Sequence, residues 1–286
     1  MGRGTATLPV ADGGGVTTAI VTDSTTSIPP GALERPDVRV VPLTFHFGSD
    51  ESYRDKIDLS NEEFFERLIV ADDFPTTSQP APGDFVEIYE ALGAYDDVLV
   101  LTLSRKLSGT YDSAVTAAGM VERPVEVLDT RSAEMGSGLI LREALREIDE
   151  GGDFKEVRRA AESAIGRCNM FFAVATLKYL ARSGRLGQAQ RLLGAALDVR
   201  PVLRVEDGEV VPHRRTRGRK RQIATIVDEV RPAAEAGRPL YFGHVAAPEM
   251  LSELAERLGV EERLVTEIGG VVGSHVGPGA YGVAYL

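Results

Sequence analysis

Short runs of apolar residues alternate with segments of helical periodicity along almost the whole chain. This alternation is typical of a layered α/β protein. The apolar runs predict strands over residues 18–22, 38–43, 98–103, 125–128, 171–176, 199–205, 209–213, 240–245, 264–268 and 281–285. The helical periodicity predicts helices over residues 60–70, 82–92, 109–121, 133–150, 153–167, 218–235 and 248–258. Ser60 and Glu63 have the spacing of a capping box at the first of these helices.

The order of these segments divides the chain into two predicted lobes. Strand-helix-strand units in residues 17–167 predict a doubly wound, mostly parallel sheet. The pattern changes near residue 168, and residues 199–213 hold two short strands around an Asp-Gly hairpin signal. We therefore expect a mixed α+β lobe over residues 168–286. Residues 1–16 are Gly-rich and polar, lack the apolar core of a signal peptide, and are expected to form a disordered tail.

One polar loop stands out because it follows a buried strand directly. The run over residues 98–103 leads into this loop, and Ser108-Gly109-Thr110 opens a helix rich in small residues. A helix N-terminus collects unpaired backbone N–H groups, and the hydroxyls add donors and acceptors at the same point. Such a site suits an anion, and on the residues alone phosphate and carboxylate both remain open.

Four further polar stretches each have an ordinary structural interpretation. Residues 22–26 follow the first strand and fit turn and cap chemistry. Residues 76–83 fit a helix-entry loop, and residues 274–279 fit a Gly-rich loop before the last strand, in which glycines allow close approach of a ligand. Residues 212–221 form a basic run, which usually means a solvated helix start. Because the rest of the chain is acidic, we interpret it as a docking patch for an acidic partner or a phosphate.

Composition narrows the class of protein. The 286 residues carry a net charge of −11, with a pI near 5.0. That balance argues against nucleic acid as the main partner, because duplex binding rewards positive charge. No apolar run approaches the roughly 20 residues of a membrane span. Cys168 is the sole cysteine, which excludes an intrachain disulfide, favours packing over nucleophilic chemistry, and makes a reducing cytoplasm the expected location.

Several nucleotide and metal signatures are absent or fail on their context. Residues 277–282 fit G-x-G-x-x-G, but no helix can follow so near the C-terminus. No G-x-x-x-x-G-K-[ST] occurs, and Gly273-Ser-His-Val-Gly277 places histidine where a nucleophile elbow needs serine. The four histidines lack metal-ligand spacing. We therefore expect no cofactor and no metal.

Taken together and in order, the polar motifs resemble those of the DegV family of fatty-acid-binding proteins, from about Thr18 to the C-terminus. The resemblance is carried by Val21-Thr-Asp-Ser-Thr25, Val41-Pro-Leu43, Thr77-Ser-Gln-Pro80, Leu107-Ser-Gly-Thr-Tyr111 with Ser113-Ala114, Asp129-Thr130-Arg131, Leu180-x-x-Ser-Gly-Arg-Leu186, Arg200-Pro-Val-Leu-x-Val-x-x-Gly208, Arg217-Gly-Arg-Lys220 and His275-Val-Gly-Pro-Gly279.

The resemblance implies a lipid-binding protein and not an enzyme. It implies that a long-chain fatty acid lies in a buried tunnel between two α/β lobes, with its carboxylate presented to an ATP-dependent fatty-acid kinase subunit that forms an acyl phosphate. The residues that carry over to the carboxylate are Thr77 and Ser108, supported by the Gly109 N–H and His275, with Ser24 and Ser78 as further candidates and Thr76 competing with Thr77. The candidate residues for docking the kinase are Arg182, Arg185, Arg217, Arg219 and Lys220.

Two other functions use the same anion site. A stand-alone esterase would pair Ser108 with His275, which requires the two side chains within about 3.2 Å or one shared water. A sensor of a phosphorylated metabolite would use the helix N-terminus without an apolar tunnel.

Overall fold

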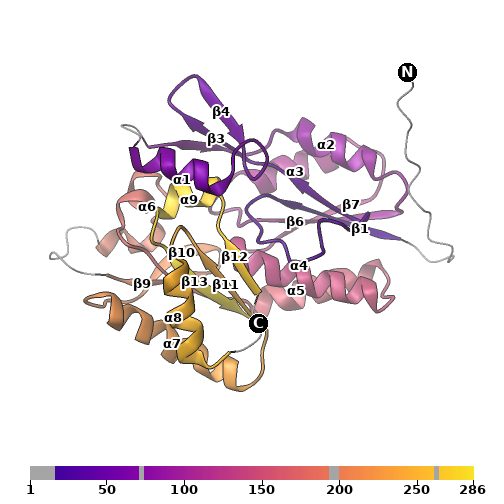
Figure 1. Cartoon of the computed structure of the whole chain (residues 1–286). Helices are drawn as coiled ribbons and strands as arrows, with labels where there is room; N and C mark the ends of the chain where they lie inside the picture. Colours follow the sequence, from indigo (N-terminus) through magenta and orange to yellow (C-terminus); the bar gives the residue numbers. More distant parts are fainter. Residues whose placement is uncertain (1–16, 71–73, 193–199, 261–263) are drawn as a thin grey trace.

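The computed structural model describes residues 17–70, 74–192, 200–260 and 264–286 (Figure 1). The predicted tail, residues 1–16, lies outside the described residues. The strands are β1 (Thr18–Asp23), β2 (Val38–Val41), β3 (Thr44–Phe47), β4 (Glu51–Arg54), β5 (Thr76–Ser78), β6 (Asp97–Thr102), β7 (Val125–Asp129), β8 (Asn169–Ala173), β9 (Val202–Glu206), β10 (Glu209–Arg214), β11 (Leu240–His244), β12 (Leu264–Glu267) and β13 (Tyr281–Tyr285). The helices are α1 (Asn61–Val70), α2 (Pro82–Ala91), α3 (Thr110–Ala118), α4 (Glu134–Asp149), α5 (Phe154–Arg167), α6 (Lys178–Arg182), the 3₁₀ helix η1 (Gly187–Leu192), α7 (Arg219–Glu235), α8 (Pro248–Leu258) and α9 (Gly270–Val276).

The first sheet is parallel throughout, in the order β2-β1-β6-β7. Alternate residues of its central strands face opposite sides. Val21 and Val100 pack in one cluster with Phe85 of α2 and Ala114 of α3, whereas Ile20 belongs to the cluster on the α4 side. Helices therefore cover both faces, which confirms the predicted doubly wound arrangement.

The second sheet is mixed, in the order β10-β9-β8-β13-β11-β12. Only its β11–β12 pair is parallel. The predicted hairpin joins β9 to β10, where Asp207 and Gly208 have φ of 48° and 81°. Positive φ at both central residues is what a type I′ turn requires, and Asp-Gly adopts it at low cost. Helices α7 and α8 cover one face of this sheet, and the other face points toward α4.

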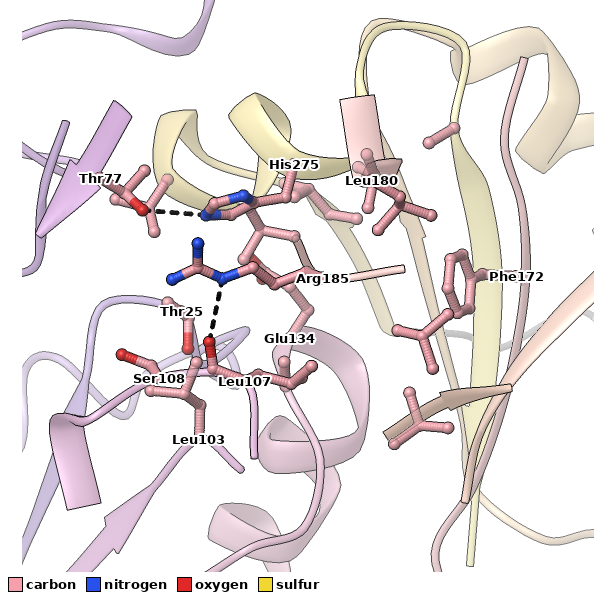
Figure 2. A pocket seen from close by; sticks show the side chains of 18 of the residues that line it. Thr25, Thr77, Leu103, Leu107, Ser108, Glu134, Phe172, Leu180, Arg185 and His275 are labelled. Carbon is pink, nitrogen blue, oxygen red and sulfur yellow. Dashed lines mark hydrogen bonds between the residues drawn. The ribbon is translucent and has the colours of Figure 1, made fainter. Parts of the chain in front are cut away.

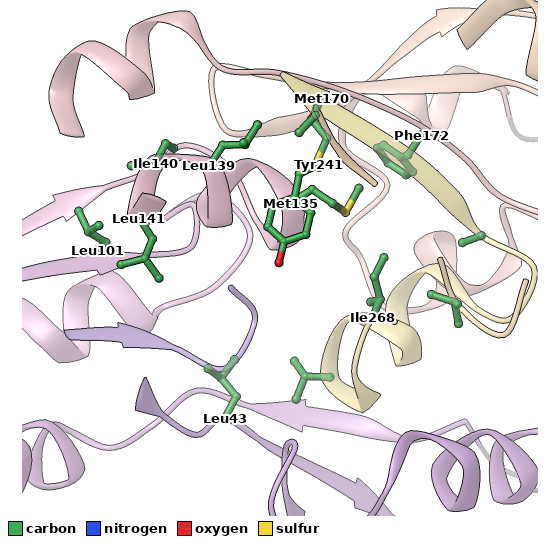
Figure 3. Close-up of a cluster of buried hydrophobic side chains, with 14 of the residues drawn as sticks. Leu43, Leu101, Met135, Leu139, Ile140, Leu141, Met170, Phe172, Tyr241 and Ile268 are labelled. Carbon is green, nitrogen blue, oxygen red and sulfur yellow. The ribbon is translucent and has the colours of Figure 1, made fainter. Parts of the chain in front are cut away.

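Helix α4 lies between the two sheets and joins them into one core (Figure 1, Figure 3). Leu139 and Ile140 of α4 share a buried cluster with Leu101 of the parallel sheet and Tyr241 of the mixed sheet. At Gly138 a Cβ atom would overlap the Ser27 carbonyl oxygen and press on the Tyr241 ring, so glycine permits the close approach. The Tyr241 hydroxyl then donates a hydrogen bond to the Ile28 carbonyl at 3.0 Å.

A small antiparallel sheet, β4-β3-β5, was not predicted. Its strand β5 covers Thr76–Ser78, which the sequence analysis placed in a helix-entry loop. Helix α9 likewise replaces the Gly-rich loop expected before the last strand, up to Val276. Both expectations were wrong because β5 is short and polar and α9 contains glycine and valine, so neither segment shows its structure by local preference.

The predicted capping box at α1 is confirmed. The Glu63 N–H donates to Ser60 Oγ at 3.2 Å, and the Ser60 N–H donates to Glu63 Oε2 at 3.0 Å. Among the described residues, no helix has both the length and the apolar character needed to cross a bilayer.

Candidate functional site

A cavity of about 380 Å³ lies where the three sheets and α4 meet. This volume falls within the usual range for small-molecule sites. Its walls are mainly apolar and come from α4, α9, the mixed sheet and the loops after β1 and β6. The lining residues with polar side chains are Thr25, Thr77, Ser78, Gln79, Ser108, Glu134, Arg185, His275 and Tyr281.

Thr77 and His275 meet at one end of the cavity (Figure 2). Thr77 Oγ1 lies 2.9 Å from His275 Nε2, although the two residues are 198 positions apart in the chain. Strand β5 brings Thr77 to this point and α9 brings His275. Burial and the nearby Arg185 charge lower the pKa of His275 to about 4, so its ring is neutral at neutral pH. Thr76, the competing threonine, is exposed and does not line the cavity.

Ser108 lines the same end and lies just before α3. Its Oγ is 3.0 Å from Thr110 Oγ1, a contact that orients both hydroxyls at the helix start. Gly109 is the N-cap of α3 and does not line the cavity itself. A Cβ atom at Gly109 would overlap the Gln79 side chain, whose Nε2 donates to Ser113 Oγ at 3.0 Å. Glycine at this position therefore lets Gln79 reach across the start of α3.

Arg185 brings a positive charge to this end of the cavity. Its Nε donates to the Leu107 carbonyl at 3.2 Å, and its Nη1 donates to the Ser183 carbonyl at 2.7 Å. Figure 2 shows the guanidinium between the Thr77–His275 pair and Ser108. Arg185, which we expected among the docking residues, lines the cavity wall instead.

The Asp23 carboxyl connects the loops that follow β1 and β6, which line the cavity near Ser108. Its Oδ1 accepts hydrogen bonds from the N–H and the hydroxyl of Thr25, at 3.0 and 2.6 Å. Its Oδ2 accepts from the Leu103 N–H at 2.7 Å, so one buried carboxyl joins the ends of β1 and β6. The Thr25 side chain lines the cavity, whereas Ser24 accepts from the Leu43 N–H at 3.1 Å and lies outside the lining.

A second polar group, Glu134, reaches the cavity from the start of α4. Its Oε2 accepts from Ser27 Oγ at 2.9 Å and lies 3.9 Å from Lys56 Nζ. Its Oε1 is buried and has no hydrogen-bond partner among the described residues. Burial, opposed by Lys56 and reinforced by the carboxyls of Asp55 and Asp23, raises the pKa of Glu134 to about 7. The residue also has a φ of 43°, which is unusual for a side chain of this size.

Asp55 belongs to the same acidic cluster but faces α9. The Val271 N–H donates to its Oδ1 at 3.2 Å, at the start of the helix that carries His275. Burial raises the pKa of Asp55 above its ordinary value. We refer to Asp23, Asp55 and Glu134, with Lys56, as the acidic cluster.

The remaining predicted residues lie outside the cavity or at its margin. Ser78 lines the cavity edge, and its Oγ is 2.6 Å from His46 Nε2. The Arg182 guanidinium lies over the Phe74 ring, 4.6 Å from its centroid. Arg219 is paired with Glu249 at 3.6 Å, and Arg217 and Lys220 are exposed beside it in the chain.

Sequence reasoning missed two of the functional side chains and misassigned a third. Thr25 belongs to the motif after β1, and its neighbour Ser24 was chosen in its place. Arg185 belongs to the motif Ser183-Gly-Arg185, which carries a usable signal. No sequence signal distinguishes Glu134, because glutamates are common in the first turn of surface helices.

No direct hydrogen bond joins Ser108 to His275 among the described residues. Ser108 Oγ is hydrogen-bonded to Thr110, and His275 Nε2 is hydrogen-bonded to Thr77. The remaining ring nitrogen, His275 Nδ1, is buried without a partner among the described residues. The histidine thus contacts a threonine hydroxyl, not the serine that the esterase would activate.

Comparison with known proteins gives consistent results over nearly the full chain. Residues 17–286 match the family described as "Uncharacterised protein, DegV family". A DegV domain-containing protein of Streptomyces coelicolor is 38% identical over 274 residues, which are 93% of this chain and 96% of that protein.

Solved structures of DegV proteins are also similar to this chain over nearly its full length. The structure described as fatty acid binding of a DegV family protein from Thermus thermophilus has a TM-score of 0.88 and 39% identity, and covers 94% of this chain and 99% of that one. The structure of DegV from Bacillus subtilis, described as a fatty acid binding protein, has a TM-score of 0.86 and 32% identity, with coverage of 94% and 99%.

Proposed function

This chain belongs to the DegV family, and we propose that it binds a long-chain fatty acid with the carboxylate held between Thr77, Ser108 and Arg185. The observation that carries the proposal is the asymmetry of the cavity. Mostly apolar walls lead to an end where a guanidinium and two hydroxyls gather around one space (Figure 2). The names of the Thermus and Bacillus relatives, which describe fatty acid binding, support the same ligand class.

The two halves of such a ligand make different energetic demands. Each buried methylene contributes about 0.8 kcal/mol, so a chain of about sixteen carbons gains on the order of 10 kcal/mol before ordering costs. A carboxylate removed from water costs free energy unless donors meet it. Arg185, Thr77 and Ser108 offset that cost, and the acyl chain supplies the affinity.

His275 has a positioning role in this proposal. A neutral imidazole with its proton on Nε2 donates to Thr77 Oγ1, which leaves the threonine hydroxyl free to donate to the carboxylate. The lowered pKa of His275 is consistent with this neutral form. Because the donors at this end also favour the ionised acid, the bound carboxylate stays nucleophilic.

We further propose that a partner fatty-acid kinase uses this carboxylate to form an acyl phosphate. This part of the proposal rests on the family resemblance and on the exposed basic residues at the start of α7. Docking is tested by the triple variant Arg217→Glu, Arg219→Glu, Lys220→Glu, which should lower kinase-dependent acyl-phosphate formation while fatty-acid affinity stays the same. The matched control reverses Lys155, Arg158 and Arg159 on α5, which also comprise two arginines and one lysine. Equal activity of both variants would refute docking at α7.

Native mass spectrometry of the purified chain tests the binding function. We expect a co-purifying acid of about C14 to C18, released by denaturation and identified after extraction. An empty protein that hydrolyses esters would instead support the esterase, and a bound phosphorylated metabolite would support the sensor.

A further inference from the structure

The apolar cavity shares part of its wall with a second pocket. This second pocket has a volume of about 190 Å³ and lies where the β7–α4 loop, the end of α5 and the β9–β10 turn come together. Its lining includes Thr130, Arg131 and Arg204 and is mainly polar. Met170 and Val205 line both spaces, so their side chains form the partition between them.

The partition lies away from the carboxylate end. Met170 and Val205 are direct partners in the register of β8 and β9, two pairs before Phe172 and Leu203. Residues two apart on a strand face the same side, so Met170 points to the same face as Phe172. Phe172 lies across the cavity from Thr77 and Ser108 in Figure 2, and Met170 lies near Phe172 in Figure 3. An acyl chain that starts at Arg185 therefore runs toward this partition.

We infer that Met170 and Val205 close the tail end of the fatty-acid site and set the longest acyl chain that it accepts. The inference rests on the proposed function and names its specificity-determining residues. The polar pocket behind the partition makes the limit sharp, because a methyl terminus that passed Met170 would meet Arg131 and Arg204 and not an apolar wall. Methionine suits an end wall that adapts, since its unbranched side chain fills irregular space.

The test compares the affinities of saturated acids from C12 to C22 for the delipidated protein. Met170→Ala removes three heavy atoms beyond Cβ and should move the preferred chain length up by about two to four carbons. Acids longer than the wild-type optimum should gain about fourfold in affinity per added carbon until the new limit. Val205→Ala should produce a smaller shift in the same direction, and Met170→Phe should move the preference to shorter chains.

Met250→Ala is the matched control. Met250 is a buried methionine of α8 that lines neither space, so its truncation should lower thermal stability and leave the chain-length profile unchanged. An unchanged profile in Met170→Ala and Met170→Phe, with wild-type binding intact, would overturn the inference and leave the proposed function standing. If the wild type bound none of these acids, the proposed function itself would fail. If Met170→Ala does not fold, Met170→Phe and Val205→Ala decide the question.

Discussion

The cavity touches two polar groups of side chains that differ in charge and in hydrogen bonding. At one end, Thr77, Ser108 and Arg185 surround a space with donors, and the neighbouring His275 is neutral. On another wall, Glu134 brings in the edge of the acidic cluster, with one carboxyl oxygen buried and unpaired among the described residues. Both groups contain a titratable side chain, His275 in the first and Glu134 in the second. Only the first offers a site to an anion.

The difference shows that burial alone does not make a polar group a binding site. Burial lowers the pKa of His275 and raises the pKa of Glu134, and both shifts remove charge. At the first end the Arg185 guanidinium donates hydrogen bonds to two backbone carbonyls. At the second, burial disfavours the charge of Glu134, and Lys56 lies 3.9 Å from that carboxyl without lining the cavity, so this wall offers a ligand carboxylate no cation among the described lining residues. In the proposed function the ligand carboxylate is therefore oriented by Arg185, the one arginine or lysine among the described lining residues.

The largest expected effect concerns Glu134 and stability. Its folded pKa of about 7 lies above the ordinary value of 4.5, so the folded state binds the proton more tightly than the unfolded state. The stabilisation from this proton is complete below the unfolded pKa and is lost as pH rises through the folded pKa. Relative to Glu134→Gln, the wild-type free energy of unfolding should fall by about 3 kcal/mol between about pH 4.5 and pH 8.

Urea denaturation over this pH range measures the difference. Glu126→Gln is the control, because Glu126 is about half exposed on β7 and its replacement should give a curve parallel to the wild type. If the Glu134→Gln curve also ran parallel to the wild type, the acidic cluster would not hold a proton as described.

The next largest effect is expected for Arg185. Arg185→Gln removes the charge but keeps donors, and should weaken fatty-acid binding about 30-fold, the size of a charge-assisted hydrogen bond of about 2 kcal/mol. A fatty alcohol of the same chain length should bind the variant and the wild type alike. Isothermal titration with both ligands separates loss of charge recognition from damage to the apolar wall. Arg182→Gln, whose guanidinium lies over Phe74, should change neither affinity more than twofold.

The parallel sheet and α9 differ in how far the sequence predicts them. The parallel sheet was predictable because Ile20 and Leu99 belong to continuous apolar runs that are buried on both faces. Helix α9 was not predictable from the sequence, because Gly270 and Gly273 have a low intrinsic preference for helix. In the structure a Cβ atom at either glycine would press on the rings of Phe64 or Phe65, so tertiary packing against α1 selects these residues.

The candidate site likewise contains residues that sequence motifs indicate and residues that only the structure identifies. Thr77, Ser108 and His275, the residues that the motifs indicate, line the cavity. Arg185 and Glu134 could be assigned to the cavity only from the structure, because the packing of distant elements brings each of them there. The motif Ser183-Gly-Arg185 marks Arg185 but does not show whether it lies on the surface or in a cavity wall, and no motif marks the glutamate at the start of α4. The motifs thus led to Thr77 and Ser108, whereas Thr25 and Glu134 were missed and Arg185 was assigned to docking.

The next effect in size concerns the Thr77 hydroxyl. Thr77→Val keeps the shape of the side chain and removes the donor, and should weaken fatty-acid binding about five- to tenfold, as expected for one neutral hydrogen bond of about 1 kcal/mol. Thr76→Val on the exposed side of β5 is the control and should leave the affinity unchanged. Equal losses at the two positions would show that β5 itself, and not the Thr77 hydroxyl, supports binding.

The smallest effect is the one that distinguishes positioning from direct contact. If His275 acts only by orienting Thr77, His275→Phe should lower fatty-acid affinity several-fold in the wild type but less than twofold in Thr77→Val.

Ser108 contacts a different residue, Thr110, so its contribution should be independent of Thr77. The double variant Ser108→Ala, Thr77→Val should therefore lose about 30-fold in fatty-acid affinity, the product of the two single losses. A double-mutant cycle in fatty-acid affinity measures both couplings. Additive losses for Thr77 and His275 would mean that the histidine contacts the ligand itself, which would move it from the positioning group to the binding group.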